Sequence, residues 1–397
     1  MVMKLRSSLA LAILTVAAHA LLAQANDGSK PSINNVPGAS YPRVSSDGRV
    51  TFRVKAPTAQ KVAIEPLNGN VEHTGYNGMG KAPYEMIKDS EGYWTVTTPL
   101  VTPGFHYYSV LIDGNEFNDP SSETFFGANR ELSGVEVPEP GVDFYLVKET
   151  PHGIVRIFWF FSKVTGQWRR AFVYTPPSYD ANVQQRYPVL YLRHGGGENE
   201  TGWVNQGHVN FILDNLIAAG KAKPMIVVME SGMVRLSGQT GTPDNGPAAM
   251  NDALVKETIT DLIPSIDANF RTRADREHRA LAGLSMGSAQ TLQIGLSSLD
   301  QFSALGVFSR PPVEHFDPKT AFNGVMADSA VFNTKLHLFW FGAGTEETGI
   351  FNSLKETRAA FDKAGVKYTY TEYPGLAHEW QIWRKQLNDF APLLFKW

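Results

Sequence analysis

One serine stands in a setting that suits nucleophilic chemistry. Ser285 is the centre of a G-x-S-x-G pentapeptide, Gly283–Gly287, which follows the strand-like segment Arg279–Ala282 and precedes a stretch of small residues. That order predicts a strand, a tight turn and a helix. Such a turn points the serine hydroxyl out above a sheet, and the flanking glycines let neighbouring backbone approach closely. The context predicts that Ser285 is a nucleophile for acyl transfer.

A serine hydroxyl needs a general base, and in this kind of site the chain order is serine, acid, histidine. Three histidines follow Ser285. His337 alternates within an apolar run, which favours a packed core residue or one edge of a sheet. His315 lies in a proline-rich loop with no strand to position it. His378 follows a predicted strand and precedes the last predicted helix, so we expect His378 to be the base.

The acid that orients the histidine should follow the strand before the histidine's own strand. The predicted strand Lys335–Phe341 runs into a loop that holds two adjacent carboxylates, Glu346 and Glu347. We predict that Glu347 is the acid, and Glu346 remains the alternative. Both could instead be surface acids at the start of the next helix, because carboxylates favour helix N-termini.

Two preorganised N–H donors are needed where negative charge develops on the substrate. The residue after the nucleophile, Met286, should supply one. The glycine-rich run His194–Gly197, directly after the predicted strand Val189–Leu192, should supply the other, and Gly196 is the predicted donor. His194 itself is expected to hold the loop. The run lacks the spaced Lys and Ser/Thr of a phosphate-binding loop.

Two tryptophans lie close in sequence to these motifs. Trp203 and Trp380 are predicted to bind substrate as walls of an acyl pocket, although a lone tryptophan is more often part of a core. No H-E-x-x-H or similarly spaced set of ligands occurs, so neither a metal nor a cofactor is expected.

Residues 150–397 alternate between strand and helix patterns, which favours an α/β fold with a mostly parallel sheet. The predicted strands are Arg170–Tyr174, Val189–Leu192, Met225–Met229, Arg279–Ala282, Lys335–Phe341 and Lys367–Tyr373. The predicted helices are Phe211–Ala219, Ala253–Ala268, Ser288–Leu296, Ser353–Lys363 and Trp380–Phe395.

The chain before residue 136 has a different character. Residues 1–25 combine a short basic start, an apolar run and a small-x-small end, which predicts a signal peptide cleaved near Ala25. Residues 30–135 hold short alternating runs, with a hairpin turn at Asp113-Gly114, and are expected to form a small β-sandwich. Residues 136–149, rich in Pro, Gly and acid, are expected to be a linker.

Composition narrows the classes of partner. The 397 residues carry 36 basic and 39 acidic side chains in a mixed pattern, which disfavours nucleic acid as a partner. After signal cleavage no apolar run is long enough to span a bilayer, so we expect a soluble protein that is secreted or periplasmic. The chain has no cysteine, which excludes a thiol nucleophile.

Together these motifs resemble the feruloyl and acetyl esterases of the first carbohydrate esterase family, related to esterase D. The matching pieces cover nearly all of residues 150–397 and are Pro151–Gly153, Arg170–Pro176, Tyr187–Gly197, Glu200–Trp203, Gly283–Gly287 and Ala377–Trp380. The resemblance implies an α/β-hydrolase whose triad is Ser285, His378 and an acid in Gly342–Glu347. Many relatives have Asp at the acid position, whereas this chain offers Glu. The first domain is similar to early-set modules of glycogen- and starch-acting enzymes, which implies either polysaccharide binding or bracing of the esterase.

The resemblance implies a substrate as well: a feruloylated or otherwise acylated polysaccharide or oligosaccharide, such as arabinoxylan. Rival functions are an acetyl xylan esterase, a siderophore esterase of the enterochelin type, and an acyltransferase. A further rival, from another class, is a carbohydrate-binding protein that has lost catalysis.

Overall fold

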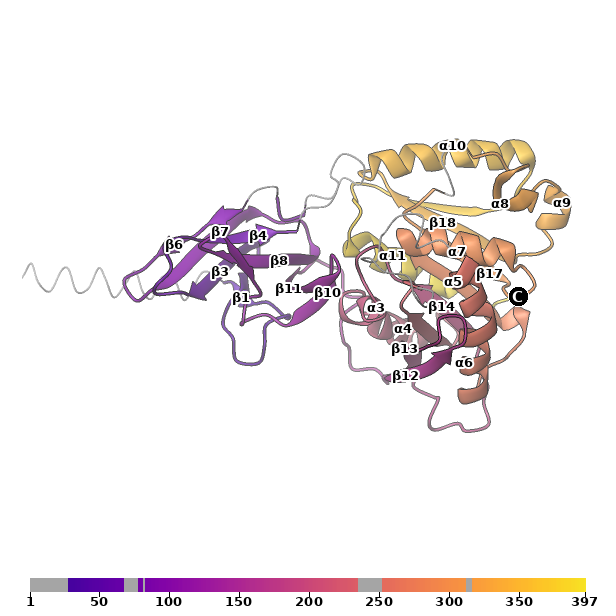
Figure 1. Ribbon diagram of the computed structural model, residues 1–397, viewed down its shortest axis with the longest axis horizontal. Helices are drawn as coiled ribbons and strands as arrows, with labels where there is room; N and C mark the ends of the chain where they lie inside the picture. The colour runs from indigo at the N-terminus through magenta and orange to yellow at the C-terminus, as the bar shows by residue number, and fades with distance from the viewer. Residues whose placement is uncertain (1–27, 68–77, 81–82, 235–251, 312–315) are drawn as a thin grey trace, which may run out of the picture. The chain divides into compact units, whose positions relative to one another are not determined.

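The computed structural model describes residues 28–67, 78–80, 83–234, 252–311 and 316–397 (Figure 1). The predicted signal peptide and His315 lie outside the described residues. The chain divides into two compact units. The first takes in the described residues up to Leu67, Gly78–Glu123 and Ser133–Pro138, and the second takes in Thr124–Leu132 and Glu139–Trp397.

The strands between Lys30 and Val137 form two antiparallel sheets. One has the strand order β1 (Lys30–Pro31), β2 (Arg43–Val44), β3 (Arg49–Lys55), β7 (Tyr93–Leu100) and β6 (Ile87–Lys88). The other has the order β10 (Thr124–Gly127), β11 (Arg130–Val137), β8 (Gly104–Ile112), β4 (Val62–Pro66) and β5 (Tyr84–Glu85), with β9 (Asn115–Phe117) on β8.

Alternating burial explains why these strands form a core. Val50, Phe52 and Val54 of β3 are buried, whereas the residues between them are partly exposed. The predicted hairpin is present, because Ile112 pairs with Asn115 across Asp113 and Gly114. Both turn residues have positive φ, 49° and 84°, as a two-residue turn of this kind requires.

The second unit is built on one eight-stranded sheet. Its order is β12 (Ile154–Ser162), β13 (Gln167–Thr175), β15 (Ile226–Glu230), β14 (Val189–Arg193), β16 (Arg279–Leu284), β17 (Ala304–Phe308), β18 (Leu338–Gly344) and β19 (Thr369–Tyr373). The strands from β15 to β19 run parallel, and β12 and β13 are antiparallel additions at one edge. Every residue of β14, β15, β16 and β17 is buried, as expected for parallel strands covered on both faces.

Helical segments connect the strands of the second unit. They are α3 (Gly202–Asn205), α4 (Val209–Ala218), α5 (Asp252–Glu257), the π-helix η2 (Thr258–Leu262), α6 (Ile263–Asn269), η3 (Arg276–His278), α7 (Met286–Ser297), α8 (Ala321–Gly324), α9 (Ser329–Phe332), α10 (Thr348–Ala364), α11 (Trp380–Phe390) and η4 (Ala391–Leu393). None of the helices in the described ranges is long and apolar enough to cross a membrane.

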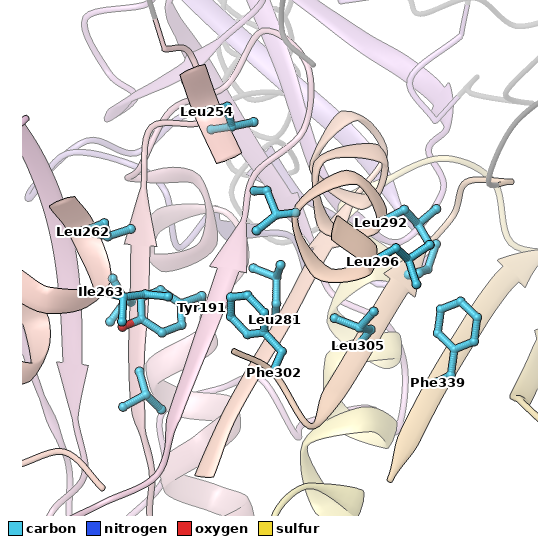
Figure 2. Close-up of a cluster of buried hydrophobic side chains, with 14 of the residues drawn as sticks. Tyr191, Leu254, Leu262, Ile263, Leu281, Leu292, Leu296, Phe302, Leu305 and Phe339 are labelled. Carbon is cyan, nitrogen blue, oxygen red and sulfur yellow. The ribbon is translucent and has the colours of Figure 1, made fainter. Parts of the chain in front are cut away.

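A hydrophobic core on one face of the sheet holds α7 in place. Figure 2 shows Leu292 and Leu296 of α7 over Leu305 of β17, with Leu281 of β16 beside them. All four side chains are at most 3% exposed. Truncating one such leucine to alanine costs about 2–5 kcal/mol of stability. This packing holds α7 against β16 and β17, and the serine motif lies at the first turn of that helix.

Two predictions about elements need correction. Strands β12 and β17 were not expected from the sequence. His337 is not a core residue, because β18 begins only at Leu338 and 41% of the His337 side chain is exposed. Its Nε2 contacts the carboxylate of Glu277 at 2.5 Å, and its ring stacks on Trp397.

The domain boundary also differs in detail. The sequence pattern predicts one continuous first domain over residues 30–135. In the structure, Thr124–Leu132 belongs to the second unit instead. Two hydrogen bonds join this segment to the rest of the second unit: Gln206 donates to the carbonyl of Phe126 at 3.1 Å, and the N–H of Asn129 donates to the carbonyl of Gly197 at 2.8 Å.

Candidate active site

Ser285 occupies a strained turn between β16 and α7. Its backbone has φ 50° and ψ −114°, a region that non-glycine residues rarely adopt. The strain persists because the N–H of Ser285 donates to the carbonyl of Phe308 at 2.9 Å and because β16 and α7 pack on either side. The turn lifts the side chain above the carboxyl end of the sheet.

Both glycines of the motif are required by space. A Cβ on Gly283 would lie 2.5 Å from the carbonyl oxygen of Gly287. A Cβ on Gly287 would lie 2.5 Å from the carbonyl oxygen of His194 and 2.7 Å from that of Arg193. These are backbone atoms that cannot give way, so the motif brings the start of α7 against the end of β14.

His378 and Glu347 reach Ser285 from the ends of β19 and β18. Nε2 of His378 lies 2.9 Å from Oγ of Ser285, and Nδ1 lies 2.6 Å from Oε1 of Glu347. The second oxygen of Glu347 accepts the N–H of Gly344 at 2.7 Å. Glu347 is fully buried, whereas its neighbour Glu346 is exposed. The structure thus brings together the three residues that were predicted and leaves Glu346 outside the row.

The triad of Ser285, His378 and Glu347 has a defined proton arrangement. A buried carboxylate accepts hydrogen bonds only, so Nδ1 of His378 donates to Glu347 and Nε2 is left to accept the hydroxyl proton of Ser285. This is the tautomer that a general base for Ser285 needs. The ring of Trp383 packs edge-on against His378 at 5.0 Å between centroids. Sequence reasoning did not single out Trp383, because nothing in its spacing marks it as a neighbour of His378.

The glycine-rich loop after β14 lies beside the serine. A Cβ placed on Gly195 would lie 3.7 Å from Cβ of Ser285. The N–H of Gly195 donates to the carboxylate of Glu198 at 3.1 Å. Because that N–H is engaged, Gly195 is a poor oxyanion donor. Gly196, the predicted donor, is the exposed residue of the loop. Met286 is the first residue of α7, where the helix leaves backbone N–H groups without intrahelical partners.

His194 holds this loop as a neutral imidazole. Its Nδ1 donates to the carbonyl of Gly195 at 2.8 Å, and its Nε2 accepts the N–H of Gly232 at 3.0 Å. Burial lowers the pKa of His194, which favours the neutral form that this pair of bonds requires.

A buried ionic cluster fixes the residue before the loop. Arg193 donates to Glu230 at 2.7 Å and to the hydroxyl of Thr258 at 2.8 Å, and its carbonyl accepts Nε1 of Trp203 at 2.9 Å. Burial, together with the nearby charge of Glu230, raises the pKa of Glu257, which lies in the same cluster. A buried arginine must be paired to be tolerated, so the cluster keeps the end of β14 in one position.

The predicted role of the two tryptophans needs correction. Trp203 is 1% exposed and Trp380 is 2% exposed, and their rings meet edge to face at 5.4 Å. Trp203 also packs against Phe308 and Trp380 against Trp383, so neither ring has a face open to a ligand. They form packing under the site instead of pocket walls. Among the described residues, no group of three or more His, Asp or Glu side chains is placed to hold a metal ion.

Comparisons with known proteins identify the family of the chain. Residues 162–394 match the family described as "Putative esterase". An endo-1,4-beta-xylanase/feruloyl esterase of Xylanibacter ruminicola is 40% identical over 376 residues, which are 92% of this chain and 47% of that protein. Endo-1,4-beta-xylanase Y of Acetivibrio thermocellus is 28% identical over 56% of this chain and 21% of its own. The chain thus spans half or less of these curated relatives.

Solved structures share the fold. A CE1 ferulic acid esterase from Anaeromyces mucronatus covers 64% of this chain and 96% of its own, with 24% identity and a TM-score of 0.56. An enterochelin esterase from Shigella flexneri covers 88% of this chain and 92% of its own, with 16% identity and a TM-score of 0.61. The chain therefore belongs to this esterase family, and its second unit has the α/β-hydrolase fold.

Proposed function

We propose that this protein releases hydroxycinnamic acids, ferulic acid above all, from plant cell-wall polysaccharide such as arabinoxylan. The observation that carries the proposal is the row Ser285, His378 and Glu347, with contacts of 2.9 and 2.6 Å at the carboxyl ends of parallel strands. The 40% identical relative, whose name includes feruloyl esterase, supports the choice of acyl group.

The chemistry is acyl transfer to water in two steps. His378 takes the proton of Ser285 as Oγ attacks the ester carbonyl. It then gives that proton to the sugar oxygen as the ester C–O bond breaks, so that the sugar leaves with a free hydroxyl. The N–H groups of Met286 and Gly196 stabilise the oxyanion. Water, deprotonated by His378, then attacks the acyl-enzyme, so that the acid leaves and Ser285 is restored.

Export belongs to the same proposal. A polymeric substrate cannot enter a cell, so a protein that acts on it has to be secreted or periplasmic. The apolar run in residues 1–25 supports this location.

The test is hydrolysis of methyl ferulate beside an acetyl ester, with the mature protein and the Ser285→Ala variant. Release of ferulate by the native protein and its loss in the variant are expected. Release of acetate alone would overturn the acyl specificity and favour an acetyl xylan esterase. If neither ester is cleaved, turnover of a cyclic siderophore ester would point to that rival. If Ser285 did not react with a fluorophosphonate, the result would favour the rival function of a carbohydrate-binding protein without catalysis.

A further inference from the structure

An exposed aromatic surface lies at the edge of the second unit's sheet. Ile157, Trp159 and Phe161 alternate along the edge strand β12, so they share one face, and they are 60%, 54% and 45% exposed. Trp168 on β13 is 66% exposed. We refer to these four side chains as the aromatic face. Large aromatic side chains normally bury most of their area, so a contiguous exposed group of them marks a binding surface.

Strand pairing holds the face together. Phe161 is paired with Trp168 across β12 and β13, and their rings meet at 5.7 Å and 72°. Trp159 is paired with Arg170, which shares the face of Trp168. The rings are therefore fixed to two paired strands, not to a loop. Figure 1 shows β12 and β13 at the margin of the sheet.

The face lies at the same end of the sheet as Ser285. Ala171 of β13 pairs with Glu230, the last residue of β15, and the two strands are antiparallel. Trp168 and Arg170 therefore lie at and beyond the carboxyl end of the parallel strands, and β12 carries Trp159 and Phe161 to the same level. The serine turn and the glycine-rich loop also follow carboxyl ends of strands in this sheet.

An ion pair connects the aromatic face to the loop that flanks Ser285. Nε of Arg170 binds Oε1 of Glu200 at 2.6 Å. Glu200 is three residues after Gly197, and in the same loop Glu198 accepts the N–H of Gly195. The ion pair of Arg170 and Glu200 thus ties the aromatic strands to the loop that flanks Ser285.

We propose that the aromatic face binds the sugar chain of the polymer whose ester is cleaved at Ser285. The inference rests on the proposed function and deepens it. Pyranose rings present C–H groups on their flat faces and hydroxyls at their rims, so they stack on exposed aromatic rings and hydrogen-bond to side chains beside them. Arg170 stands within the face, and Lys163 and Gln167, both exposed, flank it.

The size of the face favours a sugar chain over a second copy of this protein. At the exposures given above, its four side chains offer on the order of 400–500 Å². A stable protein interface buries about 800 Å² on each partner. The charged pair of Arg170 and Glu200 beside the rings also suits hydroxyl groups better than an apolar partner surface.

Binding is tested in the full mature chain carrying Ser285→Ala, with arabinoxylan freed of its esters by alkali. We expect Trp159→Ala combined with Trp168→Ala to weaken retardation in affinity electrophoresis at least about tenfold. Trp397→Ala is the matched control, because Trp397 is also exposed but stacks on His337. If the double variant has a changed circular dichroism spectrum, the single variant Trp168→Ala is measured in its place.

Activity is measured with Ser285 intact. The double variant should keep the native kcat/KM for methyl ferulate and lose activity only on feruloylated arabinoxylan. Equal binding of arabinoxylan by the native and double-variant chains would overturn the proposal. The proposal would also fail if the native chain were a dimer, the double variant were a monomer, and both bound arabinoxylan equally. If the native chain cleaves no feruloyl ester, the proposed function fails, whereas the binding measurement still decides the role of the face.

Discussion

Glu347 accepts a hydrogen bond from Nδ1 of His378 at 2.6 Å with one carboxylate oxygen, and its other oxygen accepts the N–H of Gly344 at 2.7 Å. The backbone N–H thus fixes the rotation of the carboxylate, and the carboxylate fixes the imidazole. Because Glu347 is fully buried, water does not compete for either bond.

Replacing Glu347 by Gln should lower kcat by about 10³-fold or more while changing KM little. The amide has no charge to stabilise the imidazolium that forms when His378 takes the proton of Ser285. Steady-state hydrolysis of methyl ferulate measures this. Glu346→Gln, one residue away and exposed, should retain native rates. Equal loss in both variants would contradict the assignment of the acid to Glu347.

Gly287→Ala should abolish most activity, because the added Cβ meets the carbonyls of His194 and Arg193 at 2.5 and 2.7 Å and displaces α7 from the glycine-rich loop. Gly295→Ala on the same helix meets side-chain atoms of Leu305 from 2.4 Å outward, which can move. It should therefore lower the melting temperature with kcat largely preserved. Thermal unfolding and initial rates on both variants separate the two effects, and an active Gly287→Ala enzyme would be inconsistent with the close packing described.

Gly197→Ala should reduce kcat more than it reduces stability. Gly197 has φ +77°, and a Cβ there would lie 3.0 Å from backbone atoms of Ala128, so the loop that carries Gly196 has to shift. Gly114→Ala is the control, since Gly114 has φ +84° but open space around it. The control should show only backbone strain, of order 1 kcal/mol, with native activity. A comparable kcat for the two variants would show that the loop tolerates the shift.

Glu379 should make stability fall as pH rises. Burial raises its pKa from 4.5 to about 7, so between these values the native state holds a proton that the unfolded state has lost. The free energy of unfolding therefore decreases through this window, by up to about 3 kcal/mol from this group, and the loss is complete above pH 7. In Glu379→Gln this component should disappear, as urea unfolding at pH 5 and pH 8 would reveal. If the free energy of unfolding of Glu379→Gln changed with pH as much as that of the native chain, the pKa of Glu379 would not be raised by folding.

The serine turn and the histidine loop could be predicted because their chemistry leaves a local pattern: a strand, two glycines around a serine, and a histidine after a late strand. The sequence could favour Glu347 over Glu346 but could not exclude Glu346, because the choice depends on how the backbone turns after β18. The structure decides it by the N–H of Gly344, which no side-chain pattern encodes.

Other features are set by tertiary packing. In β12, Phe158, Trp159, Phe160 and Phe161 are all apolar, so the period-two pattern of a strand is hidden. Trp203 and Trp380 are buried although their positions beside the motifs suggested pocket walls, because aromatic residues serve cores and binding sites alike. Edge position and exposure, which only the assembled sheet defines, separate these tryptophans from Trp159 and Trp168.

The bond between His378 and Ser285 joins residues 93 positions apart, and the bond between His378 and Glu347 spans 31. Both bonds form only after β18 and β19 have docked beside β17, because Glu347 and His378 follow the ends of those two strands. Partly folded chains that have paired only β14, β15 and β16 therefore contain Ser285 without its base. During refolding, recovery of esterase activity should lag behind the return of helical circular dichroism, and a nascent or damaged chain has no reactive serine until its C-terminal strands dock.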